Sequence, residues 1–106
     1  MKKESFVYII SNYERTTIYI GVTNNIERRI LEHKTGKGSF FSSKYKLKYL
    51  LYFEEHTTIK DAIEREKRLK NWHKEWKWNL IKEENPQLVD LAEEWYDMEM
   101  VNENSI

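Results

Sequence analysis

Two short runs of β-branched and aromatic residues open the chain, at residues 5–10 and 17–21. Runs of this kind are typical of β-strands, and the polar residues 11–16 between them are typical of a turn. The pattern therefore predicts a β-hairpin. If its loop comprises the four residues 12–15, Tyr8 pairs directly with Tyr19, and the two side chains share one face of the sheet.

Two capping signals predict helices. Asn24, with Glu27 three residues later, starts a helix that should reach about Lys34 and end at Gly36. Thr58, with Asp61 three residues later, opens a second helix that should reach about residue 71.

The segment between these two helices predicts a loop and a third strand. Residues 36–46 show no periodicity and are expected to be a loop, whereas residues 48–54 have the composition of a strand.

The last third of the chain has helical spacing. Trp72, Trp76 and Leu80 recur every four residues and predict a helix over residues 72–83. Leu88, Leu91, Ala92 and Trp95 predict a further amphipathic helix, and we expect fraying beyond Met98. The expected fold is α/β (α+β), a small three-stranded antiparallel sheet flanked by helices in the order ββαβα, followed by C-terminal helices. Residues 1–98 form one domain, and residues 99–106 an acidic tail.

Composition supports one folded domain. The 106 residues are 40% hydrophobic and 14% aromatic, which is too apolar for a disordered protein. With no cysteine, disulfides, thiolate metal sites and a cysteine nucleophile are excluded, and a reducing compartment fits best. The N-terminal residues carry no long apolar stretch, so we expect a cytoplasmic protein with no membrane segment.

The formal net charge is zero, but the charges are unevenly distributed. Residues 1–80 hold 17 Lys and Arg against 10 Asp and Glu, whereas residues 81–106 hold 1 against 8. A basic body favours binding to a phosphate backbone, with salt-sensitive affinity, although the acidic end could equally serve solubility.

Glu66 is a carboxylate on a predicted buried helix face. Ile59, Ala62, Ile63 and Leu69 fall within roughly a third of the helical wheel, and Glu66 lies in its middle. Such a group must be paired, protonated or bound to metal. A structural ion pair with an inward-facing arginine and a magnesium ligand, completed by substrate phosphate and water, are equally compatible with the pattern.

Arg29 and His33 lie four residues apart and share the quarter of the wheel that holds Ile26 and Ile30. A lone histidine there is ordinarily structural. An arginine beside it favours a phosphate pocket, because a guanidinium matches phosphate oxygens and stabilises charge that develops in phosphoryl transfer.

Tyr8 and Tyr19 are compatible with ordinary strand packing. If both share one face, with space at Gly21, a phenol could take a proton from an attacking water once nearby cations lower its pKa from about 10.

The motifs resemble those of the GIY-YIG nuclease superfamily, in particular its small stand-alone bacterial branch. Val7-Tyr8-Ile9 and, ten residues later, Tyr19-Ile20-Gly21 are similar to the paired tripeptides, with Val7 in place of the usual glycine. The similarity continues through residues 19–24, 28–33, 62–67, 80–81, 85–86 and 90–91, and so covers residues 5–95.

The resemblance implies a magnesium-dependent endonuclease that hydrolyses DNA phosphodiester bonds, with manganese as a possible substitute and DNA repair or recombination as its setting. It implies Tyr8, Tyr19, Arg29 and His33 as catalytic residues and Glu66 as both catalytic residue and metal ligand. Branched or single-stranded DNA are candidate substrates. Asn79 is the only nearby candidate for an asparagine that some members add, and its spacing is unconfirmed.

The loop at residues 34–44 is basic, with interleaved aromatics. We expect Lys34, Lys37, Ser39 and Lys44 to contact DNA, and we expect Phe40 and Phe41 to be structural.

Two alternatives remain open. The chain could bind nucleic acid without turnover, or it could be a protein-interaction adaptor whose acidic C-terminal helix, around Glu93, Glu94, Trp95 and Asp97, docks a partner.

Overall fold

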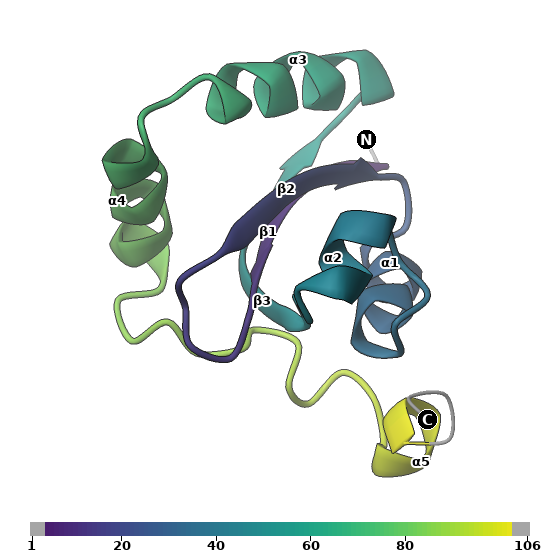
Figure 1. The fold of residues 1–106 in the computed structure, drawn as a ribbon. Helices are drawn as coiled ribbons and strands as arrows, with labels where there is room; N and C mark the ends of the chain where they lie inside the picture. Colours follow the sequence, from purple (N-terminus) through teal and green to yellow (C-terminus); the bar gives the residue numbers. More distant parts are fainter. Residues whose placement is uncertain (1–3, 103–106) are drawn as a thin grey trace.

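The structure is a computed structural model that describes residues 4–102. A three-stranded antiparallel sheet lies at its centre, with β1 between β2 and β3. Figure 1 shows α3 and α4 on one side of the sheet and α1 and α2 on the other. The elements are β1 (Ser5–Ser11), β2 (Ile18–Thr23), α1 (Ile26–Lys34), α2 (Phe40–Lys44), β3 (Tyr49–His56), α3 (Ile59–Lys70), α4 (Lys74–Glu84) and α5 (Met98–Asn102). The predicted fold class and the order of the three strands and two main helices are confirmed.

Alternation along β1 divides the core between the two faces of the sheet. Val7 and Ile9 face the α3 and α4 layer, whereas Tyr8 and Ile10 face the α1 layer. A bulge in β3 lies opposite the step between Ile9 and Ile10, so that one extra residue, Leu51, packs into the α3 side. Tyr8 is therefore fixed on the α1 side by strand geometry alone.

The hairpin has a different register from the one expected. Tyr8 pairs with Gly21, and Tyr19 pairs with Ile10, so the loop comprises six residues rather than four. The side chain of Asn12 organises this longer loop, because its Oδ1 accepts hydrogen bonds from the backbone N–H groups of residues 16 and 17. A shift of two residues keeps every side chain on its face. The two tyrosines therefore share a face as predicted, but as diagonal neighbours.

Helix capping was predicted correctly at one helix start and is displaced by one residue at the other. Thr58 caps α3 by accepting the N–H of Asp61 at 3.1 Å. Asn25, not Asn24, caps α1 by accepting the N–H of Arg28 at 3.1 Å.

The apolar face of α3 is narrower than the helical wheel predicted. Ile59 and Ile63 are largely exposed, whereas Ala62 and Leu69 are buried. The helix therefore contacts the sheet along a thin stripe of residues.

The predicted loop over residues 36–46 contains a helix. Ser39 caps α2 by accepting the N–H of Ser42 at 3.1 Å. This short helix has no apolar periodicity for a sequence pattern to detect, because only Ser42 is buried within it. Phe40 was expected to be structural, but it is 83% exposed.

The predicted helix at residues 88–95 is absent. Asp90 instead bonds the edge of β3, where its Oδ1 accepts the N–H of Leu50 at 3.0 Å, and the N–H of Leu91 donates to the carbonyl of Leu50 at 2.8 Å. The Asn85 side chain also bonds this strand, by donating from Nδ2 to the carbonyl of Leu51 at 3.0 Å. Side-chain bonds to backbone replace the helical ladder in this segment.

The loss of this helix removes the helical acidic face on which the adaptor alternative depended. A short helix, α5, follows at residues 98–102, where fraying was expected, and residues 103–106 of the predicted tail lie outside the described part of the chain. None of the helices within residues 4–102 is long and apolar enough to cross a membrane.

Candidate active site

Tyr8, His33 and Ser42 form a continuous hydrogen-bonded chain beneath α2. The Tyr8 hydroxyl lies 2.8 Å from His33 Nε2, and His33 Nδ1 lies 2.8 Å from Ser42 Oγ. The Ser42 hydroxyl also lies 3.2 Å from the carbonyl of Ser39, which can only accept. One arrangement gives every proton in the chain an acceptor: Ser42 donates to that carbonyl, His33 donates from Nδ1 to Ser42, and Tyr8 donates to His33 Nε2. We assign His33 this tautomer.

Arg29 approaches the same phenol from α1. Its Nε donates to the Tyr8 hydroxyl at 3.4 Å, and its terminal nitrogen pairs with Glu32 at 2.8 Å. Burial raises the pKa of Tyr8 to about 12, and the Arg29 guanidinium only partly offsets this rise. The expectation that nearby cations lower the pKa of this phenol is therefore wrong for Arg29 and His33, because burial outweighs the charge of Arg29 and His33 is neutral. Tyr8 is a neutral phenol at pH 7, held between a base and a cation.

His33 is buried and uncharged. Burial lowers the pKa of His33 to about 4, and the nearby Arg29 cation acts in the same direction. Its Nε2 lone pair is thus free to accept a proton at neutral pH, which is the state that a proton relay from Tyr8 requires.

Tyr19 completes an aromatic group around His33. Its ring centroid lies 5.8 Å from that of His33 and 6.4 Å from that of Tyr8. Phe41 of α2 stacks on Tyr19 with a centroid distance of 6.2 Å and an interplanar angle of 28°. Phe41 is thus partly structural, as expected, unlike Phe40.

Two glycines make room for this cluster. A Cβ on Gly21 would lie 2.4 Å from the Tyr8 hydroxyl oxygen, and a Cβ on Gly38 would lie 2.2 Å from His33 Nδ1. Both contacts are far inside van der Waals distance. Space at Gly21 was predicted, whereas no sequence pattern indicated that Gly38 serves the same purpose.

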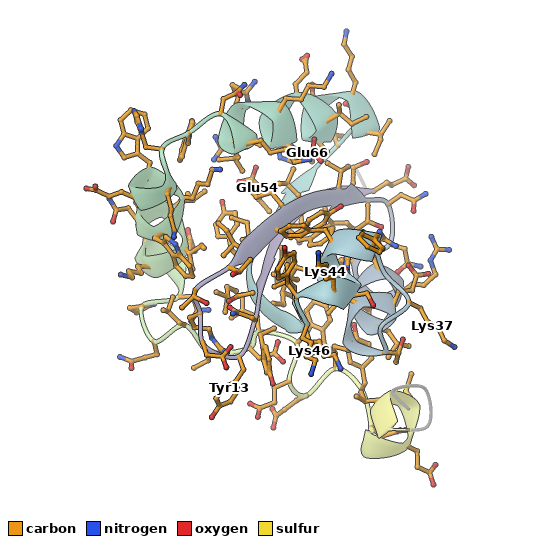
Figure 2. All side chains as sticks on the ribbon, viewed as in Figure 1. Tyr13, Lys37, Lys44, Lys46, Glu54 and Glu66 are labelled. Carbon is orange, nitrogen blue, oxygen red and sulfur yellow. The ribbon has the colours of Figure 1, made fainter. Side chains whose placement is uncertain are left out.

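Glu66 lies on the side of α3 that faces the strands (Figure 2), and its side chain is 18% exposed. Its partner is Lys70, one turn later on α3, with Nζ 3.2 Å from Oε2. The pairing cation is thus a lysine on the same helix, not an inward-facing arginine. Lys70 Nζ also lies 6.0 Å from the Tyr19 ring centroid, which links the carboxylate to the tyrosine cluster.

The donor set at Glu66 fits one kind of metal. Among residues 4–102, no three His, Cys, Asp or Glu side chains converge as a metal site. A single carboxylate suits Mg²⁺, which retains several waters and takes further ligands from substrate phosphate. Glu66 is the residue that would hold such an ion.

The predicted DNA contacts separate into two groups. Lys37 and Lys44 are exposed, and Figure 2 shows Lys37 pointing away from the body of the protein. Lys34 is instead buried, because its Nζ pairs with Asp90 at 2.5 Å and donates to the carbonyl of Lys48 at 2.8 Å. The prediction that Lys34 contacts DNA is therefore wrong. A run of basic residues in a sequence does not show which of its lysines is buried.

Two further candidates, Ser39 as a DNA contact and Asn79 as an additional site residue, lie in surroundings that differ from the predicted ones. Both polar groups of Ser39 serve α2, the hydroxyl as its cap and the carbonyl as the acceptor for Ser42. Asn79 is exposed on α4 and lines a shallow hollow with Trp72 and Trp76, on a different helix from Glu66.

Sequence reasoning missed the roles of Ser42 and Lys70. Ser42 lies in a segment that was predicted to be a surface loop, so its contact with His33 had no local signal. Lys70 carried a signal that was available, since it follows Glu66 by four residues on a helix.

Comparisons with known proteins identify the family to which the chain belongs. The GIY-YIG catalytic domain family matches residues 4–79. A UPF0213 protein of Staphylococcus epidermidis is 30% identical over 78 residues, which covers 74% of this chain and 94% of the relative. A UPF0213 protein of Haloquadratum walsbyi is 31% identical over 83 residues, which covers 78% of this chain and 92% of the relative. A UPF0213 protein of Bacillus pumilus is 28% identical over 83 residues, covering 78% and 85%.

No solved structure matches the chain significantly. The matched region nevertheless contains both tripeptides, the helix with Arg29 and His33, and the helix with Glu66. The chain therefore belongs to the GIY-YIG catalytic domain family, a nuclease superfamily.

Proposed function

We propose that this protein is a metal-dependent endonuclease that hydrolyses DNA phosphodiester bonds. The observation that carries the proposal is the position of the Tyr8 hydroxyl, which lies 2.8 Å from Nε2 of His33 and 3.4 Å from the Nε of Arg29. A phenol in this setting can pass its proton to His33 as it takes one from an attacking water.

We expect this transfer to be concerted. Because burial raises the pKa of Tyr8 to about 12, the phenolate is scarce at neutral pH and does not form in advance. Because the pKa of His33 is lowered to about 4, the imidazolium formed beside Arg29 needs a compensating charge. The phosphate supplies that charge, so the relay is favourable only with substrate in place.

Arg29 and Glu66 supply the electrostatic part of the proposal. The Arg29 guanidinium would stabilise the negative charge that develops on the phosphate oxygens. Glu66 would hold a single Mg²⁺ or Mn²⁺, which when bound supplies positive charge to the scissile phosphate and the leaving oxygen. The exposed Lys37 and Lys44 are the candidates for contacts to the DNA backbone.

The setting in DNA repair or recombination rests on family analogy alone. The first assay should include branched and single-stranded DNA beside supercoiled plasmid, because the proposal does not select one DNA structure as the substrate.

The test compares the native protein with Tyr8→Phe and Glu66→Ala, in Mg²⁺, in Mn²⁺ and in chelator. Metal-dependent cutting is expected, with a loss of about 100-fold or more in each variant. Tyr13→Phe is the matched control, because Tyr13 is an exposed tyrosine in the hairpin loop.

A different outcome would favour the non-enzymatic alternative. If no substrate is cut under any condition, while salt-sensitive DNA binding is retained and unaffected by Glu66→Ala, the chain is a nucleic-acid-binding module.

A further inference from the structure

Lys70 occupies the solvent side of Glu66. The Lys70 side chain is 50% exposed, whereas that of Glu66 is 18% exposed, and the two meet at 3.2 Å. The same ammonium lies 6.0 Å from the ring centroid of Tyr19, the tyrosine that packs beside His33. The Lys70 ammonium is thus close to both the carboxylate and the tyrosine cluster.

This position creates competition with a cation at Glu66. An ammonium on Oε2 neutralises the carboxylate, and it would repel a divalent ion placed a few ångströms away. A metal ion can be coordinated strongly by the Glu66 carboxylate only if the Lys70 ammonium moves away. A lysine can do so, because its charge sits on a flexible four-carbon stem.

Substrate provides a destination for the displaced ammonium. A phosphate bound next to a metal on Glu66 would bring acceptor oxygens within reach of the same lysine, beside Tyr19. Lys70 has three donors and no acceptor, so a phosphate oxygen is a suitable partner.

We propose that Lys70 is a catalytic residue whose ammonium exchanges Glu66 for the scissile phosphate. In the metal-free protein it holds the carboxylate, and with metal and DNA bound its ammonium contacts a non-bridging phosphate oxygen. This inference rests on the proposed metal site at Glu66. It predicts opposite effects of Lys70 on metal affinity and on turnover.

Salt bridges between residues i and i+4 are common on helix surfaces. If the Glu66–Lys70 pair were only such a surface salt bridge, replacement of Lys70 would change neither metal affinity nor turnover. Two features separate Lys70 from such a pair: its carboxylate partner is mostly buried, and its ammonium lies beside the tyrosine cluster. Lys67, an exposed lysine next to Glu66 in sequence on α3, provides a control for the loss of one positive charge.

The first experiment measures Mn²⁺ binding without DNA, by electron paramagnetic resonance or calorimetry, for the native protein, Glu66→Ala, Lys70→Met and Lys67→Met. We expect Glu66→Ala to abolish binding and Lys70→Met to lower the Kd at least threefold, well beyond the effect of Lys67→Met. Equal Kd values for Lys70→Met and the native protein would overturn the exchange. Binding that does not need Glu66 would instead overturn the metal site, and with it the proposed function.

The second experiment measures cleavage at saturating Mn²⁺. Lys70→Met should cut at least tenfold more slowly although it binds metal more tightly, whereas Lys70→Arg, which keeps a positive donor, should recover most of the rate. Cleavage by Lys70→Met at the native rate would overturn the contact with phosphate. Thermal unfolding of each variant shows whether a slow variant is folded.

Discussion

Tyr8 and His33 come from segments 25 residues apart, and they share a buried hydrogen bond of 2.8 Å. In the assigned tautomer, Ser42 donates to the carbonyl of Ser39, His33 donates from Nδ1 to Ser42, and His33 Nε2 accepts from Tyr8. The neutral imidazole is therefore oriented as a base toward the phenol.

Replacement of Ser42 should disturb both stability and activity. Ser42→Ala leaves the buried Nδ1–H of His33 without an acceptor, which should lower the free energy of unfolding by about 1–3 kcal/mol. With the tautomer no longer fixed, cleavage should slow by about tenfold and its pH profile should change. Denaturant unfolding and pH–rate measurements test this, with exposed Ser43→Ala as the control. An unchanged pH profile would contradict the tautomer assignment.

His33 should make the protein unstable in mild acid. Its pKa is lowered from 6.5 to about 4 on folding, so the unfolded chain binds the extra proton between these values. The free energy of unfolding should therefore fall as pH decreases through this window and be fully restored above pH 6.5. Every tenfold difference in proton affinity between the folded and the unfolded chain corresponds to about 1.4 kcal/mol.

Urea unfolding from about pH 4 to pH 8 measures this dependence. His33→Gln should flatten the curve, whereas His73→Gln, at an exposed position on the border of α4, should leave it as in the native protein. Equal slopes for native and His33→Gln proteins would show that another group controls the acid response.

The two site glycines should not tolerate alanine. Gly21→Ala places a methyl group 2.4 Å from the Tyr8 hydroxyl, and Gly38→Ala places one 2.2 Å from His33 Nδ1. We expect losses of about 1–3 kcal/mol of stability, measured by denaturant unfolding, and of most cleavage activity.

Gly36→Ala is the control for these two substitutions, because it strains the backbone without crowding the site. Its φ is +79° and its Cβ would meet no atom within 4 Å. The substitution should therefore cost about 1 kcal/mol while activity is retained at a temperature where the variant is folded. Native-like activity of Gly21→Ala would contradict the close packing against Tyr8.

Lys34 and Lys44 should have opposite roles despite similar sequence surroundings. Lys34→Met leaves the mostly buried Asp90 carboxylate without its cation, although two backbone N–H groups still bond it, and should lower stability by about 2–3 kcal/mol. Lys44→Met, at an exposed position on α2, should leave stability unchanged and weaken DNA binding. The log–log dependence of DNA affinity on salt should become less steep by about 0.7–0.9. A native salt slope in Lys44→Met would exclude it as a phosphate contact.

Local patterns determined the strands, the two main helices and the face on which Tyr8 and Tyr19 lie. The cap at Thr58 and the alternation of side chains along β1 depend on local backbone geometry, so they could be predicted without knowledge of the tertiary structure. The shared face survived even the error in register, because the error was an even number of residues. Arg29, His33 and Glu66 could be selected because helical spacing places residues on faces.

Tertiary structure alone decided the parts that depend on partners distant in sequence. Asp90 and Asn85 bond the edge of β3 and remove a helix that the apolar spacing had predicted. Lys34 is buried because it pairs with the carboxylate of Asp90, and Ser42 reaches His33 because α2 folds back on α1. The hydrogen-bonded chain of Tyr8, His33 and Ser42 is likewise not a property of any segment, since only folding brings the three residues together.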